Sequence, residues 1–415
     1  MKKHICVILA LLLLGLPVFG ACGKEDGPQN DPVSVGPEAG QNTETEDPSG
    51  DIPGDLPGDV PLESEGQADP GQAEEPAEAP SGAGTAEPET EQDLHAEAID
   101  SAQAGLQKLG SNFFYAKVGD CGFSAFLEAG GASSDREVLA FLSGMLYAPG
   151  LDFRIPGAGC STISAASPDG GRFFGRNFDW SCREVLLLEA HPDGGYASFS
   201  TVNVDFLKES ASANLSDEAL CAAAYYAPLD GMNEKGLCVS VNMINDSARI
   251  AQKSDLPDLT TTTALRLLLD RAATVDEALA LLGGYDLHGS YDMMVHFAVA
   301  DAEGRSVDVE YVDQKMVVVE TPILTNFYLA EGEKHGIGAA QSHERFKVLE
   351  AFLEKHPAAS VFEMRDALKA AGESNFDPDP NERTEWSVIY DQKNLTATWY
   401  RRENFAEGWT AALAR

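Results

Sequence analysis

The chain has 415 residues and a formal net charge of −38, with 29 Lys and Arg against 67 Asp and Glu. Half of this charge lies in residues 23–95, which hold 20 acidic residues, one lysine, 11 of the 22 prolines and no Phe, Trp or Tyr. Such a segment buries too little apolar surface to offset its ordering entropy, so we expect a solvated tether. The acidity also argues against a nucleic-acid partner, because phosphates would be repelled.

The first 21 residues have the pattern of a secretory signal peptide. Lys2 and Lys3 precede an apolar run over 5–19, and small residues then lead to Cys22. The run is too short for a comfortable membrane span. A cysteine at this place is typical of a bacterial lipoprotein, in which Cys22 would carry the lipid and anchor an extracytoplasmic protein to the cell membrane. A plain signal peptide that ends near a cysteine is the alternative.

From residue 96 onward the composition is that of a globular protein. We divide the chain into a signal peptide at 1–21, a lipid-anchored acidic linker at 22–95, a helical pro-segment or small subunit at 96–159, and a large domain at 160–415. In the third segment, residues 135–142 have helical spacing, and Ser134 with Glu137 forms a capping-box pattern.

The large domain alternates between strand and helix patterns. Period-two alternation predicts strands at 160–166, 173–177, 185–190, 197–204, 237–243, 293–300, 306–312, 316–321, 385–391 and 395–400. Helices are predicted at 262–271, from 274, and at about 343–355 and 361–371. Residues 168–171 would form the turn between the first two strands. Strands in runs with paired helices between them indicate an α+β fold of two stacked sheets with helices on both outer faces.

The seven cysteines show no metal-ligand spacing such as C-x-x-C, and we expect no metal and no cofactor. A disulfide among Cys182, Cys221 and Cys238 is possible in an oxidising compartment, and the sequence selects none.

Cys160 lies between small residues, ahead of a turn and a cluster of Arg, Asn and Asp. A thiol acts as a nucleophile only if a base takes its proton, and none of the eight histidines stands in a convincing position. Cleavage of the bond before Cys160 would give this residue a free α-amine with a pKa of about 7.7–8.0, which could serve as the base. The plainer interpretation is a small buried hydrophobe.

Residues 160–162, the turn and 175–180 resemble the mature start of choloylglycine hydrolases and penicillin V acylases, and are similar to acid ceramidase. Further motifs of this family follow in order at 231–237, 241–242, 324–326, 344–346 and 386–391. The resemblance implies a four-layer αββα sandwich of the N-terminal-nucleophile hydrolase type. It also implies that the chain cuts itself between Gly159 and Cys160 and then hydrolyses a small-molecule N-acyl amide through an acyl-thioester.

The resemblance further implies roles for three residues of the first hairpin. Cys160 would be the nucleophile and, through its amine, the base. Arg176 would stabilise the thiolate, and Asp179 would orient the amine. As plainer alternatives, Arg176 and Asp179 could form a structural ion pair.

Three later residues would complete the site. Asn242 would donate its side-chain amide to the developing oxyanion, Asn326 would align the amine and the scissile group, and Arg345 would complete the polar floor. Alternatively, Asn242 could face solvent, Asn326 could cap a loop, and Arg345 could be a solvated charge.

Several functional questions stay open at this stage. The long segment before Cys160 is closer to the ceramidase-like branch, which makes bile salts and penicillin V less expected substrates. An autoproteolytic acyltransferase would use the same cysteine, and a non-catalytic ligand-binding lipoprotein is an alternative of another class. Self-cleavage would separate the lipid on Cys22 from the catalytic chain. We expect residues 96–159 to stay docked non-covalently, and a degraded pro-segment is the alternative.

Overall fold

The computed structural model describes residues 95–101, 105–142, 159–210, 215–373 and 383–414. The predicted signal peptide, Cys22 and nearly all of the acidic linker lie outside these ranges. Among the described residues, no helix has the length and apolar character needed to cross a membrane. No disulfide links Cys182, Cys221 and Cys238, which are free thiols among the described residues.

The first sheet has seven strands in the order β1-β18-β17-β16-β5-β4-β15. Its strands are β1 (His95–Ala98), β4 (Gly159–Ala166), β5 (Arg172–Trp180), β15 (Ile323–Leu324), β16 (Arg383–Asp391), β17 (Thr396–Arg401) and β18 (Asn404–Ala412). Neighbouring strands are antiparallel, except that β1 runs parallel to β18.

The second sheet has nine strands in the order β14-β13-β12-β9-β8-β7-β6-β3-β2. Its strands are β2 (Gln107–Gly110), β3 (Phe113–Val118), β6 (Val185–Ala190), β7 (Ser198–Asn203), β8 (Asp230–Asn233), β9 (Cys238–Met243), β12 (Val295–Ala300), β13 (Ser306–Val312) and β14 (Lys315–Glu320). Only β3 and β6 are parallel neighbours among the described strands of this sheet. A separate parallel pair is formed by β10 (Asp258–Thr260) and β11 (Asp286–His288).

Helices connect and cover these sheets. They are α1 (Phe123–Glu128), α2 (Asp135–Leu142), α3 (Val204–Ser210), α4 (Asp217–Tyr225), α5 (Thr261–Arg271), α6 (Val275–Leu282), α7 (Ala340–Lys355) and α8 (Val361–Ala370), with a short 3₁₀ turn η2 (Ser290–Asp292). Two of these helices begin with side-chain caps. Thr274 caps α6, and Ser360 with Glu363 forms a complete capping box on α8.

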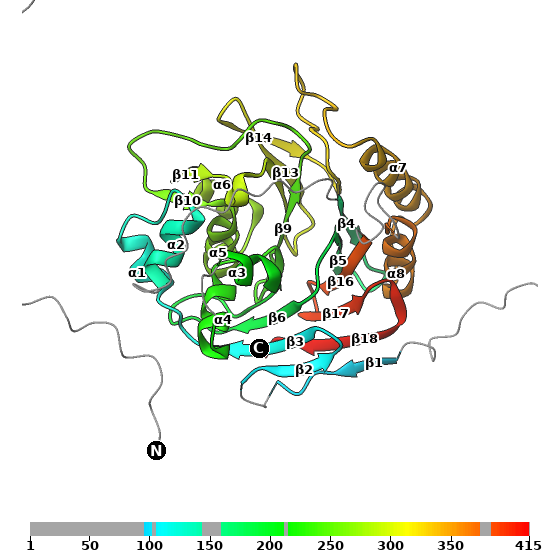
Figure 1. Cartoon of the computed structure of the whole chain (residues 1–415). Helices are drawn as coiled ribbons and strands as arrows, with labels where there is room; N and C mark the ends of the chain where they lie inside the picture. The colour runs from blue at the N-terminus through cyan, green and yellow to red at the C-terminus, as the bar shows by residue number, and fades with distance from the viewer. Residues whose placement is uncertain (1–94, 102–104, 143–158, 211–214, 374–382, 415) are drawn as a thin grey trace, which may run out of the picture. The chain divides into compact units, whose positions relative to one another are not determined.

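The layers follow the order helix, sheet, sheet, helix (Figure 1). Helices α7 and α8 pack on β4, β5 and β16, whereas α5 packs on β8 and β9 and α4 on β6. The inner faces of the two sheets meet through buried aromatic and polar side chains. Trp386 Nε1 donates to Asp230 Oδ2 at 3.0 Å, and Trp399 Nε1 donates to Thr201 Oγ1 at 3.1 Å. The predicted αββα sandwich is confirmed.

The hairpin of β4 and β5 positions the predicted nucleophile. Gly170 in its turn has φ +79°, a conformation that residues with a Cβ rarely adopt. The register pairs Cys160 with Phe178 and Thr162 with Arg176. Because directly opposite residues share a face of a sheet, Cys160 and Arg176 are diagonal neighbours on one face. Asp179 is the next residue after Phe178 and therefore belongs to the opposite face.

The segment before Cys160 differs from the predicted helical pro-segment. Its described residues contain three strands as well as the helices α1 and α2. β1 extends the first sheet beside β18, and β3 extends the second sheet beside β6. Phe113 and Tyr115 alternate inward along β3 and are fully buried. Strands of four to six residues show too few alternating positions to be recognised from the sequence. This segment therefore resembles helices separated by short breaks.

Candidate active site

Cys160 is the second residue of β4 and is 2% exposed. Its Sγ accepts a hydrogen bond from Arg176 Nη2 at 3.5 Å. Its backbone N–H donates to Asn326 Oδ1 at 2.6 Å, and its carbonyl accepts from Arg345 Nη1 at 2.7 Å. The side chains of Arg176, Asn326 and Arg345 therefore contact the thiol or the peptide groups of Cys160 directly.

Arg176 is completely buried between the two sheets. Its Nη1 donates to Asn242 Oδ1 at 2.7 Å, and its Nε forms an ion pair with Asp230 Oδ2 at 3.0 Å. Asp230 also accepts from Trp386 Nε1 and from Tyr390 OH, the latter at 2.6 Å. Asp230 was not predicted as a site residue, yet it neutralises the buried charge beside the thiol. A lone acid before the 231–237 motif gives no sequence signal for this role.

Asp179 faces the outer helices and is completely buried. Its Oδ2 accepts from Arg345 Nη1 at 3.0 Å, and its Oδ1 accepts from Thr384 Oγ1 at 2.6 Å. The same Arg345 nitrogen donates to Ser161 Oγ at 3.0 Å, and Arg345 Nε lies 3.1 Å from Glu373 Oε1. Thr384 and Glu373 are further residues that sequence reasoning missed.

Asn242 is placed differently from its predicted role. Its Oδ1 accepts from Arg176, while its Nδ2 donates to the carbonyls of Leu324 at 3.3 Å and Thr325 at 3.1 Å. The side-chain amide therefore holds Arg176 and the end of β15 in this structure. To stabilise an oxyanion, Asn242 would have to give up one of these two donations.

Asn326 follows β15 and connects three parts of the site. Its Oδ1 accepts from Cys160 N and from Arg345 Nη2, the latter at 2.9 Å. Its Nδ2 donates to the carbonyl of Met243 at 2.6 Å, directly after Asn242. These contacts would align the Cys160 nitrogen, as predicted for Asn326.

Burial dominates the electrostatics of this site. It raises the pKa of the Cys160 thiol, and the nearby Arg176 guanidinium acts in the opposite direction. Burial also raises the pKa of Asp179, against the influence of Arg345 and Thr384. A buried thiol with one guanidinium donor becomes a good nucleophile once a base stands beside it.

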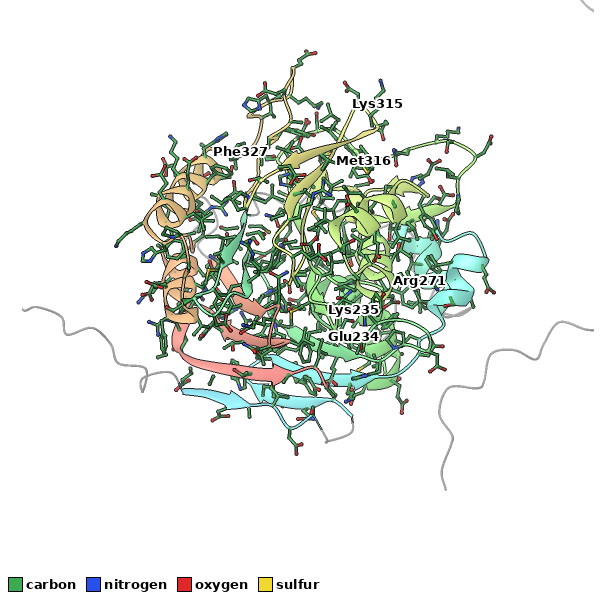
Figure 2. The ribbon with its side chains drawn as sticks, turned by 180° about the vertical axis from the view of Figure 1, so that it is seen from behind. Glu234, Lys235, Arg271, Lys315, Met316 and Phe327 are labelled. Atoms are coloured by element: carbon green, nitrogen blue, oxygen red, sulfur yellow. The ribbon has the colours of Figure 1, made fainter. Side chains whose placement is uncertain are left out.

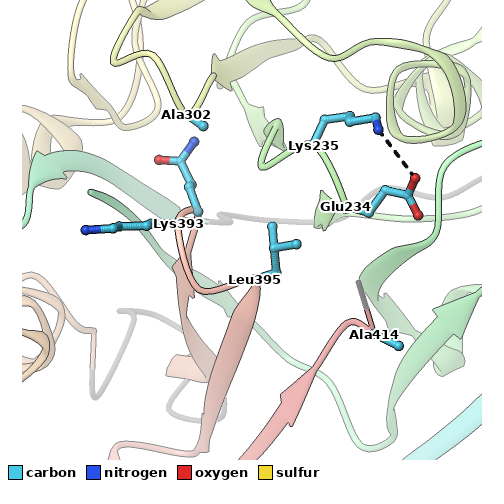
Figure 3. A pocket seen from close by; sticks show the side chains of 7 residues that line it. Glu234, Lys235, Ala302, Lys393, Leu395 and Ala414 are labelled. Atoms are coloured by element: carbon cyan, nitrogen blue, oxygen red, sulfur yellow. Dashed lines mark ion pairs between the residues drawn. The ribbon is translucent and has the colours of Figure 1, made fainter. Parts of the chain in front are cut away.

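A surface pocket lies away from this site. It has a volume of about 510 Å³ and is lined by Glu234, Lys235, Ala302, Gln392, Lys393, Leu395 and Ala414 (Figure 3). Lys393 pairs with Asp169 in the turn between β4 and β5, whereas Cys160 lies at the other end of β4. Figure 2 likewise places Glu234 and Lys235 far from Phe327, the residue after Asn326. This pocket is therefore separate from the thiol.

Residues 160–327 match the family described as linear amide C-N hydrolases, choloylglycine hydrolase family. The match confirms the family resemblance predicted from the sequence for this segment and, with it, the predicted enzyme class of hydrolases acting on linear amide bonds. Among curated proteins, no relative matches the sequence.

Solved structures with similar folds include a mutant of conjugated bile acid hydrolase from Clostridium perfringens. It shares 15% identity and a TM-score of 0.47, over 61% of this chain and 92% of that one. Penicillin V acylase from Agrobacterium tumefaciens shares 16% identity and a TM-score of 0.40, over 58% of this chain and 83% of that one. At such low identity, these likenesses assign no substrate to this chain.

Proposed function

We propose that this chain is a cysteine N-terminal-nucleophile hydrolase that cleaves the linear amide bond of a small N-acyl compound. The observation that supports this most is the pair of contacts at Cys160. Arg176 reaches the sulfur, and Asn326 holds the nitrogen that would become the α-amine. A nucleophile and its own base are then fixed by two separate groups.

Activation would proceed by self-cleavage between Gly159 and Cys160. The Cys160 sulfur attacks the Gly159 carbonyl carbon, and the peptide C–N bond breaks as the nitrogen takes up the thiol proton. Water then hydrolyses the resulting thioester, which leaves a carboxylate on Gly159 and a free amine and thiol on Cys160. Arg345 and Asn326 hold the carbonyl and the nitrogen of Cys160 in place during this exchange.

Turnover would use the new amine as a general base. The amine takes the thiol proton, the thiolate attacks the acyl carbonyl, and the substrate nitrogen leaves with that proton. Water, deprotonated by the same amine, hydrolyses the acyl-thioester and releases the acid. Asp179 lies beside Arg345 on the opposite face of the hairpin and orients the amine, while Asn242 is the proposed oxyanion donor.

We further propose that the fragment before Cys160 stays bound after cleavage. Besides the pairing of β1 with β18 and of β3 with β6, Tyr226 OH donates to the Cys121 carbonyl at 3.0 Å. Phe123 and Phe126 are buried with their ring centroids 5.4 Å from that of Tyr226. Each fully buried side chain of this size contributes about 1.5–3 kcal/mol. A lipid on Cys22 would then retain the enzyme at the outer face of a bacterial membrane.

A substrate screen tests the proposed activity. Wild-type protein and the Cys160→Ala variant are incubated with N-acyl amino acids, conjugated bile salts and fatty-acyl amides, and the free acid is measured. Cys182→Ala is the matched control, because Cys182 is also buried and 2% exposed. Hydrolysis by wild type and control but not by Cys160→Ala is expected. Turnover that needs an added amine acceptor would indicate an acyltransferase, and no turnover by any protein would favour a ligand-binding role.

A further inference from the structure

A second buried polar cluster lies behind the connection that carries Asn326. It consists of His296 on β12 with Asp308 and Glu310 on β13, all completely buried. His296 Nδ1 lies 3.2 Å from Asp308 Oδ2 and 3.7 Å from Glu310 Oε1. None of the three side chains takes part in the proposed chemistry.

The imidazole reaches the active site through one carbonyl group. His296 Nε2 donates to the Thr325 carbonyl at 3.0 Å, and the same carbonyl accepts from Asn242 Nδ2 at 3.1 Å. The Cα atoms of His296 and Asn242 are direct partners between β12 and β9. His296 therefore fixes the peptide group immediately before Asn326 and lies beside Asn242.

Glu310 fixes the other end of the same connection. Its two carboxylate oxygens accept from the backbone N–H groups of Leu329 at 2.5 Å and Ala330 at 3.2 Å. Residues 325–330 are thus held from β12 and β13 on both sides of Asn326. The Asn326 side chain in turn determines where the Cys160 nitrogen lies.

The surroundings of His296 favour a positively charged ring. One ring nitrogen faces a carbonyl and therefore donates, and the other faces two carboxyl groups, which favour a second proton there. Burial lowers the pKa of His296, but Asp308 and Glu310 outweigh it and raise this pKa to about 10. Burial also raises the pKa of Asp308 to about 7.

We propose that the His296 imidazolium is a positioning residue for the nucleophile: with Glu310 it holds the Thr325–Ala330 connection so that Asn326 aligns the Cys160 nitrogen. This inference rests on the proposed function. The same three side chains have ligand atoms within 4.8 Å of one another and could hold a metal ion. A metal would need a deprotonated Nδ1, and Glu310 already accepts two backbone N–H groups, so the contacts favour the imidazolium.

The charge state is tested on the wild-type protein by NMR with ¹⁵N-labelled histidine. We expect the His296 ring to carry protons on both nitrogens at pH 8, whereas an ordinary histidine with a pKa near 6.5 is neutral there. A neutral ring, or a stoichiometric metal ion found by elemental analysis, would overturn the proposal. This measurement does not depend on catalytic activity.

The positioning role is tested with His296→Gln, which keeps a donor but removes the charge. We expect kcat and the rate of self-cleavage to fall about 10- to 100-fold, the scale of a displaced catalytic group, with KM nearly unchanged. Glu310→Gln should produce a smaller loss in kcat and serves if the first variant does not fold.

Asp270→Asn is the matched control for lost stability. Asp270 belongs to another buried ion pair, with Arg266 on α5 at 2.6 Å, and its other carboxylate oxygen accepts from Tyr225 OH on α4 at 2.7 Å. We expect this variant to lower the melting temperature while kcat is kept. If His296→Gln and Asp270→Asn both keep kcat and lose similar stability, the cluster is only structural. If the wild type itself neither cleaves nor hydrolyses, the proposed function has failed, and the NMR result alone decides the charge state.

Discussion

At the scale of residues, Cys160 has partners on both faces of its strand. On the inner face, the Arg176 guanidinium contacts the sulfur and is neutralised by Asp230. On the outer side, Arg345 joins the Cys160 carbonyl to Asp179. This division places charge next to the thiol without an exposed ion pair, in a site that water does not screen.

Replacing Arg176 with lysine tests whether the guanidinium on the inner face activates the Cys160 thiol. The ammonium of Arg176→Lys keeps the charge but lacks the planar fork that reaches both Asn242 and Cys160. Because Arg176 lowers the pKa of the thiol, we expect that pKa to rise and turnover to fall by about tenfold or more, or about 1.4 kcal/mol. The rate of Cys160 alkylation by iodoacetamide against pH measures the change. An unchanged profile would count against a direct role of Arg176.

The His296 cluster predicts how stability depends on pH. A histidine whose folded-state pKa is raised to about 10 stabilises the fold fully below its unfolded value of 6.5. This contribution is lost as pH rises from 6.5 through 10. We therefore expect the melting temperature to fall over this range, and to fall less steeply in His296→Gln. Equal slopes for the two proteins would contradict a charged His296.

Among the helices and strands, close packing limits which side chains fit on the inner and outer faces of the sheets, and two glycines show this. A Cβ at Gly231 on β8 would meet the Phe199 backbone and lie 2.8 Å from Leu269 Cδ1. A Cβ at Gly175 on β5 would lie 3.2 Å from two side-chain atoms, Ile163 Cγ2 and the flexible end of Met364. The backbone atom near Gly231 cannot shift easily, whereas the side-chain atoms near Gly175 can adjust.

Alanine substitutions distinguish these two positions. We expect Gly231→Ala to lower the free energy of unfolding by about 1–3 kcal/mol or more, the range of an overpacked core. Gly175→Ala should cost clearly less, because side-chain ends can adjust. Urea unfolding of both variants measures the difference. A larger loss for Gly175→Ala would show that the β5–α8 packing is the more rigid of the two.

The sequence predicted most elements of the large domain but not those without a strong pattern. β6 and β13 match their predicted ranges, and α5 and α8 differ by one residue. β18, α4 and the two-residue β15 were missed, because short or mixed patterns carry little periodic signal. The six predicted site residues come together from β4, β5, β9, the segment after β15 and α7. Three residues that bond to them could not be predicted, because only the tertiary fold brings these residues close to the site: Asp230, Thr384 and Glu373.

At the scale of the whole molecule, the strands before Cys160 complete the edges of both sheets. Tyr115 OH and Lys117 Nζ on β3 both contact Glu189 on β6, with the Lys117 distance at 2.7 Å. Removing the first fragment would leave this buried carboxylate without two of its partners and expose two sheet edges. The segment is therefore part of the fold and is a poor candidate for a disposable leader.

Fractionation of cells that make the wild-type protein tests the retained fragment. We expect both fragments and the activity in the membrane fraction, separating only in denaturant. Cys22→Ala is the matched variant, in which both fragments should leave the membrane together. A wild-type 160–415 fragment found alone in the medium, with the lipidated fragment left on the membrane, would rule out docking.

Intact-mass spectrometry of the purified protein shows whether Cys160 becomes the N-terminus of the catalytic chain. We predict two masses for the wild type and for Cys182→Ala, one of them that of a chain beginning at Cys160. Cys160→Ala should give a single uncut mass. A wild-type chain that stays intact while it hydrolyses amides at full rate would rule out the Cys160 amine as the base, because the base would then have to be a side chain.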